Sequence, residues 1–576
     1  MTTPRGSSHR TNIPRRSFIA GTSVAAAAVA AQSVPAGAQS STSSLSSASP
    51  AMSSSPHALP GFEAPAMATF MHGVASGDPI PDSVVLWTRV TPQEDAVPGS
   101  GLGSDVQVLW EVAVDEGFTT IVRSGEVIAS AAHDHTVHVD PHGLEPGTIY
   151  YYRFHALGAT SPVGRTKTAP DFNADLGQLS LAVASCANWE CGYFSAYRDM
   201  AERARRDEID AVVFLGDYIY EYEQGGYVGK TGASRDHWPA WEIVSLQDYR
   251  TRHGRYKTDP YLQQAHASAP WVVVWDDHET ANNSWRDGAE NHTEGVEGRW
   301  VGRRQAALQA YFEWLPVRAT SPSEGGHIYR TLRFGTLAEL TMLDLRTYRD
   351  AETTVFNFAD PNRTMLGAEQ TEWVAGQIAT SSTTWNVLGN SVMMAPLKVL
   401  TLPETSSEAS TANEAIGWIS ERTTGIAVNS DQWDGYAHDR EQLLGRLKEH
   451  GSTLLCLTGD IHSEWANEIY SGDQVIGCEL VGTSISAPNV DEIVTDKLGA
   501  YHPENNAISL LVEEVVRDQN PWVHHLDFDA HGYAVARIRQ EEVDMEFYRV
   551  SDVEVDNAPV LLAETKTWRV GAGFVR

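Results

Sequence analysis

One strand–helix–strand pattern constrains the fold of this chain more than any other feature. An apolar run ends at Cys186, a helical pattern covers about 193–206, and a second apolar run over 211–215 ends at Gly216-Asp217. A strand, a helix and a strand at this spacing predict a parallel crossover unit. Open α/β sheets bind their ligands beyond the carboxyl ends of the strands. We therefore expect Cys186 and Asp217 to lie together at one edge of a sheet.

The same pattern occurs twice more, each time with metal-binding residue types after an apolar run. The run 271–275 is followed by the letters DDHE, and the run 454–458 is followed by GDIH. A single aspartate after a buried strand is often only a helix cap or a turn residue. Because four strands end in this way, we favour one shared binding site over four separate turns.

These motifs together resemble those of the PhoD-like alkaline phosphatases in the metallophosphatase superfamily. They are Cys186 after a strand, GDYIYEY, WDDHE with Asn-Asn close after it, and GDIHS. Ordinary metallophosphatases open with Asp-x-His and close with Gly-His-x-His, so this chain is similar to the PhoD-like variant. The resemblance covers roughly Phe70 to Tyr548. It implies an α/β fold, namely a four-layer αββα metallophosphatase sandwich with an N-terminal fibronectin-like β-sandwich.

The resemblance also implies which side chains hold metal ions. A phenol ionises near pH 10, so Tyr220 would bind only a strong Lewis acid, and thiolate, phenolate and imidazole suit Fe³⁺ better than Mg²⁺ or Ca²⁺. A carboxylate where the superfamily has an asparagine favours Ca²⁺. The alternative for Tyr220 is packing between Tyr218 and Tyr222. The implied ligands are Cys186, Asp217, Tyr220 and His462 for Fe³⁺, and Asp277 and Asp460 for one or two Ca²⁺ ions, with Asp217 as the bridge.

Four further residues are candidates for contact with a substrate. His278 is placed to act on the leaving oxygen or to stabilise the transferring phosphoryl group. Arg252 lies in a basic cluster of an acidic chain, and an arginine fork matches phosphate oxygens. A solvated helix face or local salt bridges are the alternative for this cluster. Asn283 and Asn390 are candidates for lining the pocket, the latter because it ends an apolar strand. An Asp344/Arg346 pair after another strand is a candidate for supporting the site, but structural pairing is favoured.

The chain divides into five expected segments. Arg15-Arg16 before a small apolar stretch is typical of twin-arginine export, and small residues follow at a fitting cleavage position. Residues 401–430, rich in Thr, Ser and Glu, are expected to form a surface insertion. The segments are a twin-arginine signal peptide (1–38), a Ser/Ala-rich flexible leader (39–65), the N-terminal β-sandwich (66–170), the metallophosphatase catalytic domain (171–550), and a C-terminal tail (551–576) that the resemblance suggests as a lid.

The charge balance narrows the classes of partner. The chain has 42 Lys and Arg against 75 Asp and Glu, a formal net charge of −33. So acidic a chain is not expected to bind nucleic acid by bulk charge. No apolar run after the export segment is long enough to cross a membrane, so no stable membrane anchor is expected. We expect an exported, periplasmic or secreted monomer that meets the Tat translocase during export and a small phosphate ester as substrate.

Cysteines and clustered histidines leave alternatives open. Four cysteines in an exported protein are typical of two disulfides. A Cys186–Cys191 bridge would compete with metal binding at Cys186, and a Cys456–Cys478 bridge is the other candidate. Histidines also cluster at 133–138 and 524–531, where packing is favoured over a metal site. One tyrosine of the run 150–152 is expected to make a corner hydrogen bond in the β-sandwich.

Taken together, these observations predict a secreted alkaline phosphatase. It would hydrolyse phosphate monoesters, with diesters as further candidates, by attack of a metal-activated water or oxide at an Fe/Ca site. The nearer alternative is a phosphodiesterase or phospholipase D-type enzyme that uses the same site. The remote alternative is a non-enzymatic extracellular metal-binding protein.

Overall fold

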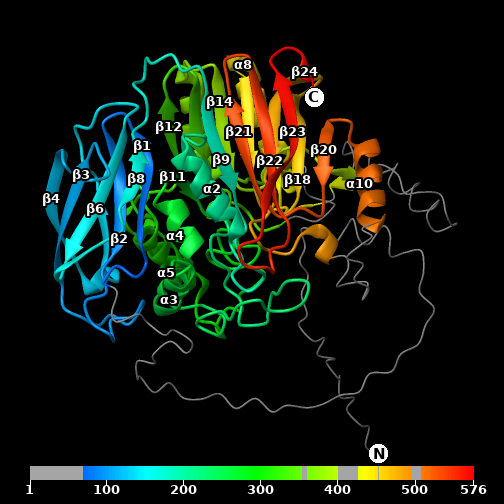
Figure 1. Ribbon diagram of the computed structural model, residues 1–576. Coiled ribbons are helices and arrows are strands. Elements are labelled where there is room, and N and C mark those ends of the chain that lie inside the picture. The colour runs from blue at the N-terminus through cyan, green and yellow to red at the C-terminus, as the bar shows by residue number, and fades with distance from the viewer. Residues whose placement is uncertain are drawn as a thin grey trace, which may run out of the picture.

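The computed structural model describes residues 69–352, 360–399, 426–427, 429–451, 453–493 and 507–575. The expected signal peptide and leader lie outside these residues, as does most of the expected insertion. Two large sheets form the centre of the molecule, and a smaller sheet lies at the N-terminal side (Figure 1). No helix within the described ranges is long and apolar enough to cross a membrane.

The first sheet has ten strands, and its centre is parallel. β9, β10 and β11 pair side by side in parallel, as the crossover pattern predicted. In spatial order the strands are β24 (Gly573–Phe574), β23 (Val560–Arg569), β22 (Glu542–Val550), β21 (Gly532–Ile538), β9 (Leu179–Ala184), β10 (Ala211–Leu215), β11 (Trp271–Val274), β1 (Val74–Ile80), β2 (Ser83–Arg89) and β5 (Thr136–Val139).

The second sheet has seven strands and faces the first. Its centre is also parallel, because β14 pairs in parallel with both β13 and β17. In spatial order the strands are β12 (Arg330–Phe334), β13 (Ala338–Met342), β14 (Trp385–Asn390), β17 (Thr453–Thr458), β19 (Gln474–Val481), β18 (Glu464–Ser471) and β20 (Val523–Asp527).

Helices cover the outer faces of both sheets, which confirms the four-layer αββα prediction. The largest apolar core joins inward side chains of the two sheets, such as Val213 and Leu455, with residues of the first helix layer. A second core lies between the other sheet and its helices, for example at Leu447. The helices are α2 (Ser195–Arg205), α3 (Leu246–Tyr256), α4 (Pro260–His266) and α5 (Trp300–Trp314) on one side, α6 (Gly367–Thr380) and α8 (Ala437–His450) on the other, and α10 (Ala507–Gln519) beside β20.

The N-terminal module is a β-sandwich, but it shares a sheet with the catalytic core. Val74 and Leu86 of one layer pack against Val108, Tyr152 and Phe154 of the other. Because β1 pairs in parallel with β11, its first layer (β1, β2, β5) continues the ten-stranded sheet. The expected boundary at 170 therefore separates chain segments but not sheets. The second layer consists of β4 (Ile121–Ala129), β3 (Val106–Ala113), β6 (Ile149–Ala156), β7 (Ala159–Thr160) and β8 (Gly164–Lys167).

The corner hydrogen bond of the sandwich and the C-terminal lid are two local predictions that the structure answers differently. The corner hydrogen bond of the sandwich is present, because the backbone N–H of Glu145 donates to the Tyr150 hydroxyl at 2.9 Å. The expected C-terminal lid is wrong for most of its length, since 560–574 forms the edge strands β23 and β24. Shorter elements complete the fold: β15 (Lys398–Val399), β16 (Ile426–Ala427), and the 3-10 helices η1 (Ala131–His133), η2 (Pro322–Glu324) and η3 (Trp433–Tyr436).

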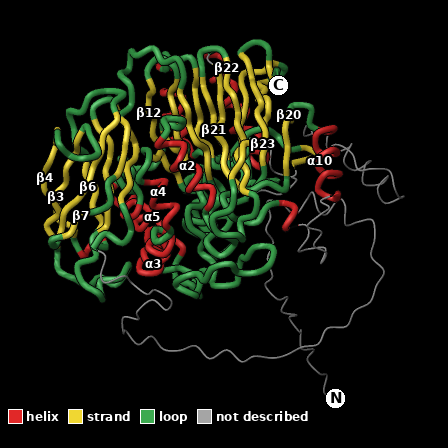
Figure 2. The backbone as a smooth tube through the Cα atoms, in the orientation of Figure 1, coloured by secondary structure: helices red, strands yellow, loops and turns green. Residues whose placement is uncertain are grey.

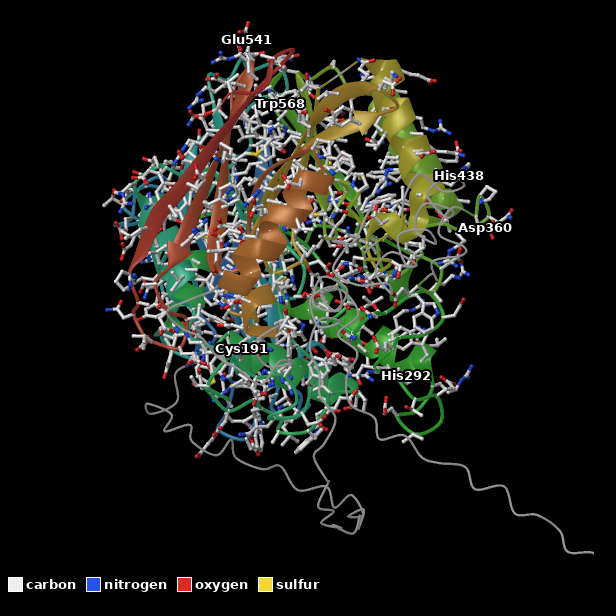
Figure 3. The ribbon with its side chains drawn as sticks, turned by 90° about the vertical axis from the view of Figure 1, so that its right-hand side faces the viewer. Cys191, His292, Asp360, His438, Glu541 and Trp568 are labelled. Carbon is white, nitrogen blue, oxygen red and sulfur yellow. The ribbon has the colours of Figure 1, made fainter. Side chains whose placement is uncertain are left out.

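The loops that follow the parallel strands gather at one end of the molecule. Figure 2 shows these connections in green below the two sheets. In Figure 3, Cys191, which follows β9, lies at the end opposite Glu541 of the β21–β22 turn and Trp568 of β23. The fold thus brings the strand ends of both sheets to one place, as the sequence pattern predicted.

Candidate metal centre and active site

Close packing at two strand ends requires glycine. Gly216, after β10, has φ +98°, and a Cβ there would lie 2.4 Å from the Cβ of Asp276. Gly459, after β17, would place a Cβ 2.7 Å from the Cβ of Ser185. These glycines let the ends of neighbouring strands approach one another, so the residues that follow them converge.

Five predicted site residues have left-handed backbone conformations. A positive φ is unfavourable for residues with a side chain, and such strain is concentrated at functional sites. It turns each side chain sharply away from the direction of its strand or loop. The residues are Cys186 (φ 59°), Asp217 (57°), Asn283 (51°), Asp460 (65°) and His462 (50°).

Five of the six predicted ligands, together with Asp276 and His278, form three overlapping groups. The donor atoms within each group lie within 4.8 Å of one another. Asp217 belongs to the first two groups, and Asp277 belongs to the last two. This sharing is the arrangement expected of carboxylates that bridge neighbouring cations. The groups are Cys186, Asp217 and His462; Asp217, Asp277 and His278; and Asp276, Asp277 and Asp460.

Tyr220 joins the first group through its hydroxyl. The hydroxyl donates to Oδ2 of Asp217 at 3.1 Å and lies 3.4 Å from Nε2 of His462. The His462 ring is oriented by the carbonyl of Pro488, 2.7 Å from Nδ1, so that Nε2 faces the group. Tyr220 is fully buried. Thiol, phenol, imidazole and carboxylate therefore meet in a single buried place.

The donor set fits a metal centre. Oδ1 of Asp217 is buried and has no hydrogen-bond partner among the described residues. Burial raises the pKa of Asp217 well above its usual range, and Asp277 and Asp276 add to the rise against the opposing effect of His278. Burial and Asp276 likewise raise the pKa of Asp460. Cations would compensate these crowded carboxylates, which are costly to ionise without them.

A buried arginine neutralises the far side of the acidic cluster. The Arg346 guanidinium donates to both oxygens of Asp276, at 2.6 and 2.7 Å, and to Asp431 at 2.8 Å. It also reaches Asp460 at 3.4 Å. Asp276 is thereby committed to Arg346, which leaves Asp277 and Asp460 as the more available carboxylates. Asp276 therefore supports the site through its ion pair with Arg346.

His278 is oriented by a buried glutamate. Its Nδ1 lies 2.7 Å from Oε2 of Glu221, and its ring packs on that of Tyr220 with centroids 4.2 Å apart. Burial opposes ionisation of Glu221, but the neighbouring His278 outweighs it and lowers the glutamate pKa to about 2. Burial lowers the pKa of His278, yet Asp277 and Glu221 raise it more, so it lies well above its usual value. The pair is therefore an ion pair beside the metal-type groups.

Glu279 holds two strand ends together. Its carboxylate accepts the backbone N–H groups of Asp217 at 3.0 Å, Tyr218 at 2.6 Å and Asp276 at 2.8 Å. Glu279 therefore fixes the loops that follow β10 and β11.

A pocket opens over these groups and encloses about 550 Å³ of empty space, counting the part open to solvent. Asn283 lines it, as expected, and its backbone N–H donates to Asp277 at 2.6 Å. The other lining residues are Asp217, Tyr222, Tyr227, Asp277, His278, Asn282, Asn429, Asp431, Asp460, Ile461, His462 and Ile493.

Comparison with known proteins decides the family. The PhoD-like phosphatase family matches residues 181–547, and the N-terminal domain of PhoD-like phosphatases matches 55–170. The chain belongs to the PhoD-like phosphatase family. It is 41% identical over 434 residues to alkaline phosphatase D of Bacillus subtilis (strain 168), covering 73% of this chain and 69% of that protein. A solved structure of PhoD matches with a TM-score of 0.75 and 34% identity, over 90% of this chain and 94% of that one.

Family membership makes the chain a phosphoric ester hydrolase with PhoD-like alkaline phosphatase function. The alternative of a non-enzymatic metal-binding protein is therefore not supported. The metal-type groups agree with this function, because phosphate-ester hydrolysis is commonly assisted by adjacent cations.

Arg252 does not face the substrate pocket of this PhoD-like phosphatase, so that prediction is wrong. Its side chain is fully buried in α3 and donates only to backbone carbonyls. Such an arginine holds a loop in place, and its full burial keeps it away from a bound phosphate. The acceptors are the carbonyls of Tyr220, Tyr222 at 3.1 Å, Trp238 at 3.2 Å, Pro239 at 2.9 Å and Trp241 at 3.3 Å.

Asn390 does not line the pocket either. It is fully buried, accepts from the indole N–H of Trp433 at 2.7 Å, and donates to the Thr458 hydroxyl at 3.2 Å. The expectation placed it correctly at the end of β14, but its side chain is directed into the core between β14 and β17. It is a structural residue.

The disulfide alternatives are also excluded, because all four cysteines are free and buried. Cys456 and Cys478 belong to neighbouring strands but pack into different cores on opposite faces of the sheet. The histidines near 133–138 and 524–531 contact carbonyls and carboxylates, and none belongs to a metal-type group within the described residues.

Sequence reasoning missed three residues of the site. Glu221 stood inside the quoted motif GDYIYEY, so its place after the aspartate was a usable signal. For Arg346 the sequence favours structural pairing over its alternative of supporting the site, whereas the side chain neutralises the acidic cluster. Asp431 carried no local signal, because it reaches the site only through the fold and its ion pairs with Arg346 and Arg349.

Proposed function

We propose that this enzyme is an exported alkaline phosphatase that hydrolyses phosphate monoesters at a centre of Fe³⁺ and Ca²⁺. The observation that carries the proposal is the chain of three donor groups that share Asp217 and Asp277. Cys186, Tyr220 and His462 supply the soft and phenolic donors that suit Fe³⁺ on one side. Asp277 and Asp460 supply the hard oxygens that suit one or two Ca²⁺ ions on the other.

The residues in and around the pocket indicate what the protein itself contributes to hydrolysis. When bound, adjacent cations supply the Lewis acidity that makes water a nucleophile at moderate pH. His278, held by Glu221, is placed to donate a proton to the leaving oxygen or to stabilise charge on the phosphoryl group. Arg346 compensates the carboxylates that remain, so that the site keeps its shape. The buried position of these groups strengthens each electrostatic interaction.

One observation favours phosphate diesters as additional or better substrates. The described residues that line the pocket include no lysine or arginine. A phosphate monoester carries two negative charges at alkaline pH, whereas a diester carries one. A diester therefore needs fewer cationic side chains to compensate its charge. A phosphodiesterase or phospholipase D-type activity on the same site is therefore the second candidate.

The test is hydrolysis of a nitrophenyl phosphate monoester and of a bis-nitrophenyl diester at alkaline pH, with added Ca²⁺ or with a chelator. A visible absorption spectrum of the same protein reports tyrosinate bound to Fe³⁺. Calcium-dependent turnover with a charge-transfer band is expected, and the two rates rank the substrates. A folded, colourless protein without turnover would overturn the proposal.

Asp217→Asn tests the bridge directly. The variant should lose most of its bound metal and at least about a hundredfold in kcat, because one shared ligand serves two ions. Asp473→Asn, in the exposed turn between β18 and β19, is the matched control. Near-normal turnover with full metal content in Asp217→Asn would exclude the bridging role.

We also propose export by the twin-arginine route and a monomeric state. The support is the Arg15-Arg16 motif before a small apolar stretch, together with the acidic composition. Replacing both arginines by lysine should retain the enzyme in the cytoplasm, and cell fractionation would show it. Unimpaired export of that variant, or a dimer mass by light scattering, would contradict these proposals.

A further inference from the structure

Two tyrosines form a wall of the pocket beside His278. Tyr222 and Tyr227 both line the pocket, and their rings meet edge to face with centroids 5.6 Å apart. The Tyr227 ring is stacked with that of His278 at 6.4 Å, and the Tyr222 ring lies 5.5 Å from it. The two phenols are therefore fixed around the imidazole that the proposed function places against the phosphoryl group.

Among the described residues, the hydroxyls of these tyrosines are not engaged by a partner. Neither hydroxyl has a hydrogen-bond partner within the described part of the chain, and neither is among its enclosed, unpaired atoms. The neighbouring tyrosines differ, since the Tyr218 hydroxyl lies 2.8 Å from His266 and that of Tyr220 donates to Asp217. With respect to the described part of the chain, Tyr222 and Tyr227 thus present unshared O–H donors at the pocket.

The rest of the lining offers few other donors. The side-chain amides of Asn282 and Asn283 donate to Glu290, and that of Asn429 donates to Gln432. The guanidinium of Arg346 already donates hydrogen bonds to carboxylates. A phosphate ester needs donors for its oxygens, and a phenol O–H is such a donor.

We propose that the Tyr222 and Tyr227 hydroxyls, together with Nε2 of His278, donate hydrogen bonds to the non-bridging oxygens of the bound phosphate ester. This inference rests on the proposed function, because it requires a phosphate ester in this pocket. It assigns substrate binding to two residues of the loop after β10. The two phenol donors carry no charge, so they suit mono- and diesters alike.

The position of Tyr227 is set from the far end of the chain. Glu554, in the loop between β22 and β23, accepts from the backbone N–H of Thr231 at 2.9 Å and from its hydroxyl at 2.8 Å. Asp552 of the same loop pairs with Lys230 at 3.3 Å. Through these contacts the loop holds the segment that carries Tyr227. Glu554 is therefore a positioning residue for the pocket wall, although it does not touch the pocket.

Substitution by phenylalanine tests the donors while it keeps the rings. Tyr222→Phe and Tyr227→Phe should each lower kcat/KM for the nitrophenyl monoester by roughly tenfold or more, the usual effect of losing a hydrogen bond to a charged group. Inhibition by inorganic phosphate should weaken in parallel. Metal content and the visible spectrum should stay as in the wild type. Tyr470→Phe, on β18 away from the pocket, is the matched control and should change none of these quantities.

The outcomes separate this inference from the proposed function. An active wild type whose two phenylalanine variants keep their kcat/KM and their phosphate inhibition would overturn this inference alone. A wild type that hydrolyses neither ester would overturn the proposed function and this inference with it. Replacing Glu554 by alanine should raise KM several-fold with little change in kcat or spectrum, whereas Glu541→Ala, at the opposite end of the molecule in Figure 3, should leave KM unchanged.

Discussion

Nδ1 of His278 lies 2.7 Å from Oε2 of Glu221, and the two side chains come from loops that follow neighbouring parallel strands. Glu221 is fully buried and also accepts from the backbone N–H of Asn282 at 2.8 Å. The carboxylate therefore determines which ring nitrogen is turned to the pocket. A carboxylate in this position would also stabilise a positive charge on His278.

Replacing Glu221 by glutamine should impair catalysis more than metal binding. The amide cannot stabilise an imidazolium as a carboxylate does, and it can favour the wrong ring orientation, so kcat/KM should fall about 10- to 100-fold. Steady-state kinetics and metal analysis on the same preparation check this. Glu541→Gln, far from the pocket, is the control. Loss of metal in proportion to activity would contradict a role of Glu221 in orienting His278.

Replacing Cys186 by serine should alter the iron side of the site. A hydroxyl is a poorer and harder ligand than a thiolate, so bound iron should fall by about tenfold or more and the charge-transfer band should shift or bleach. Iron analysis and the visible spectrum measure both effects. Cys456→Ala, in the core behind the second sheet, should keep the wild-type band. An unchanged spectrum and rate in Cys186→Ser would make Cys186 a core residue.

Replacing Arg252 by leucine should destabilise the fold and not specifically weaken substrate binding. The variant leaves several buried carbonyls without a donor, so the free energy of unfolding should fall by about 3 kcal/mol. Urea unfolding measures this change. Arg205→Leu, at the exposed end of α2, is the control. A normal unfolding midpoint combined with a higher KM would restore the original interpretation of Arg252 as a phosphate ligand.

Asp529 should make stability depend on pH. Burial, with Asp491, Asp527 and Glu513 nearby, raises its pKa to about 8. The native state therefore keeps a proton on Asp529 that the unfolded state releases near pH 4. The contribution of this bound proton to the stability of the fold is lost as the pH rises through 8.

Replacing Asp529 by asparagine should remove that loss. Relative to wild type, the variant should gain stability progressively as the pH is raised from 5 to 9. Thermal unfolding midpoints across this range measure the difference, with Asp473→Asn as the control. Parallel curves for wild type and Asp529→Asn would show that Asp529 does not titrate as the buried acid described above.

The sequence by itself, through its strand-end motifs and the family that they resemble, predicted the αββα layers and the gathering of most candidate metal ligands at one edge. Cys186, Asp217 and Asp277 each follow an apolar run that forms a strand. Because the carboxyl ends of parallel strands meet at one edge of a sheet, the sequence predicts that these residues lie at that edge. The same logic located His278. This inference holds for residues whose location in the fold is set by their position at the end of a strand.

Only the tertiary structure decided which neighbours serve the site. Arg252 looked suited to phosphate, but packing of α3 against its adjoining loop buries it among carbonyls. Asp431, Arg346 and Glu554 act through partners far away in the chain, and no local pattern records such contacts. The direction of a side chain and the depth of its burial depend on segments that meet only after folding.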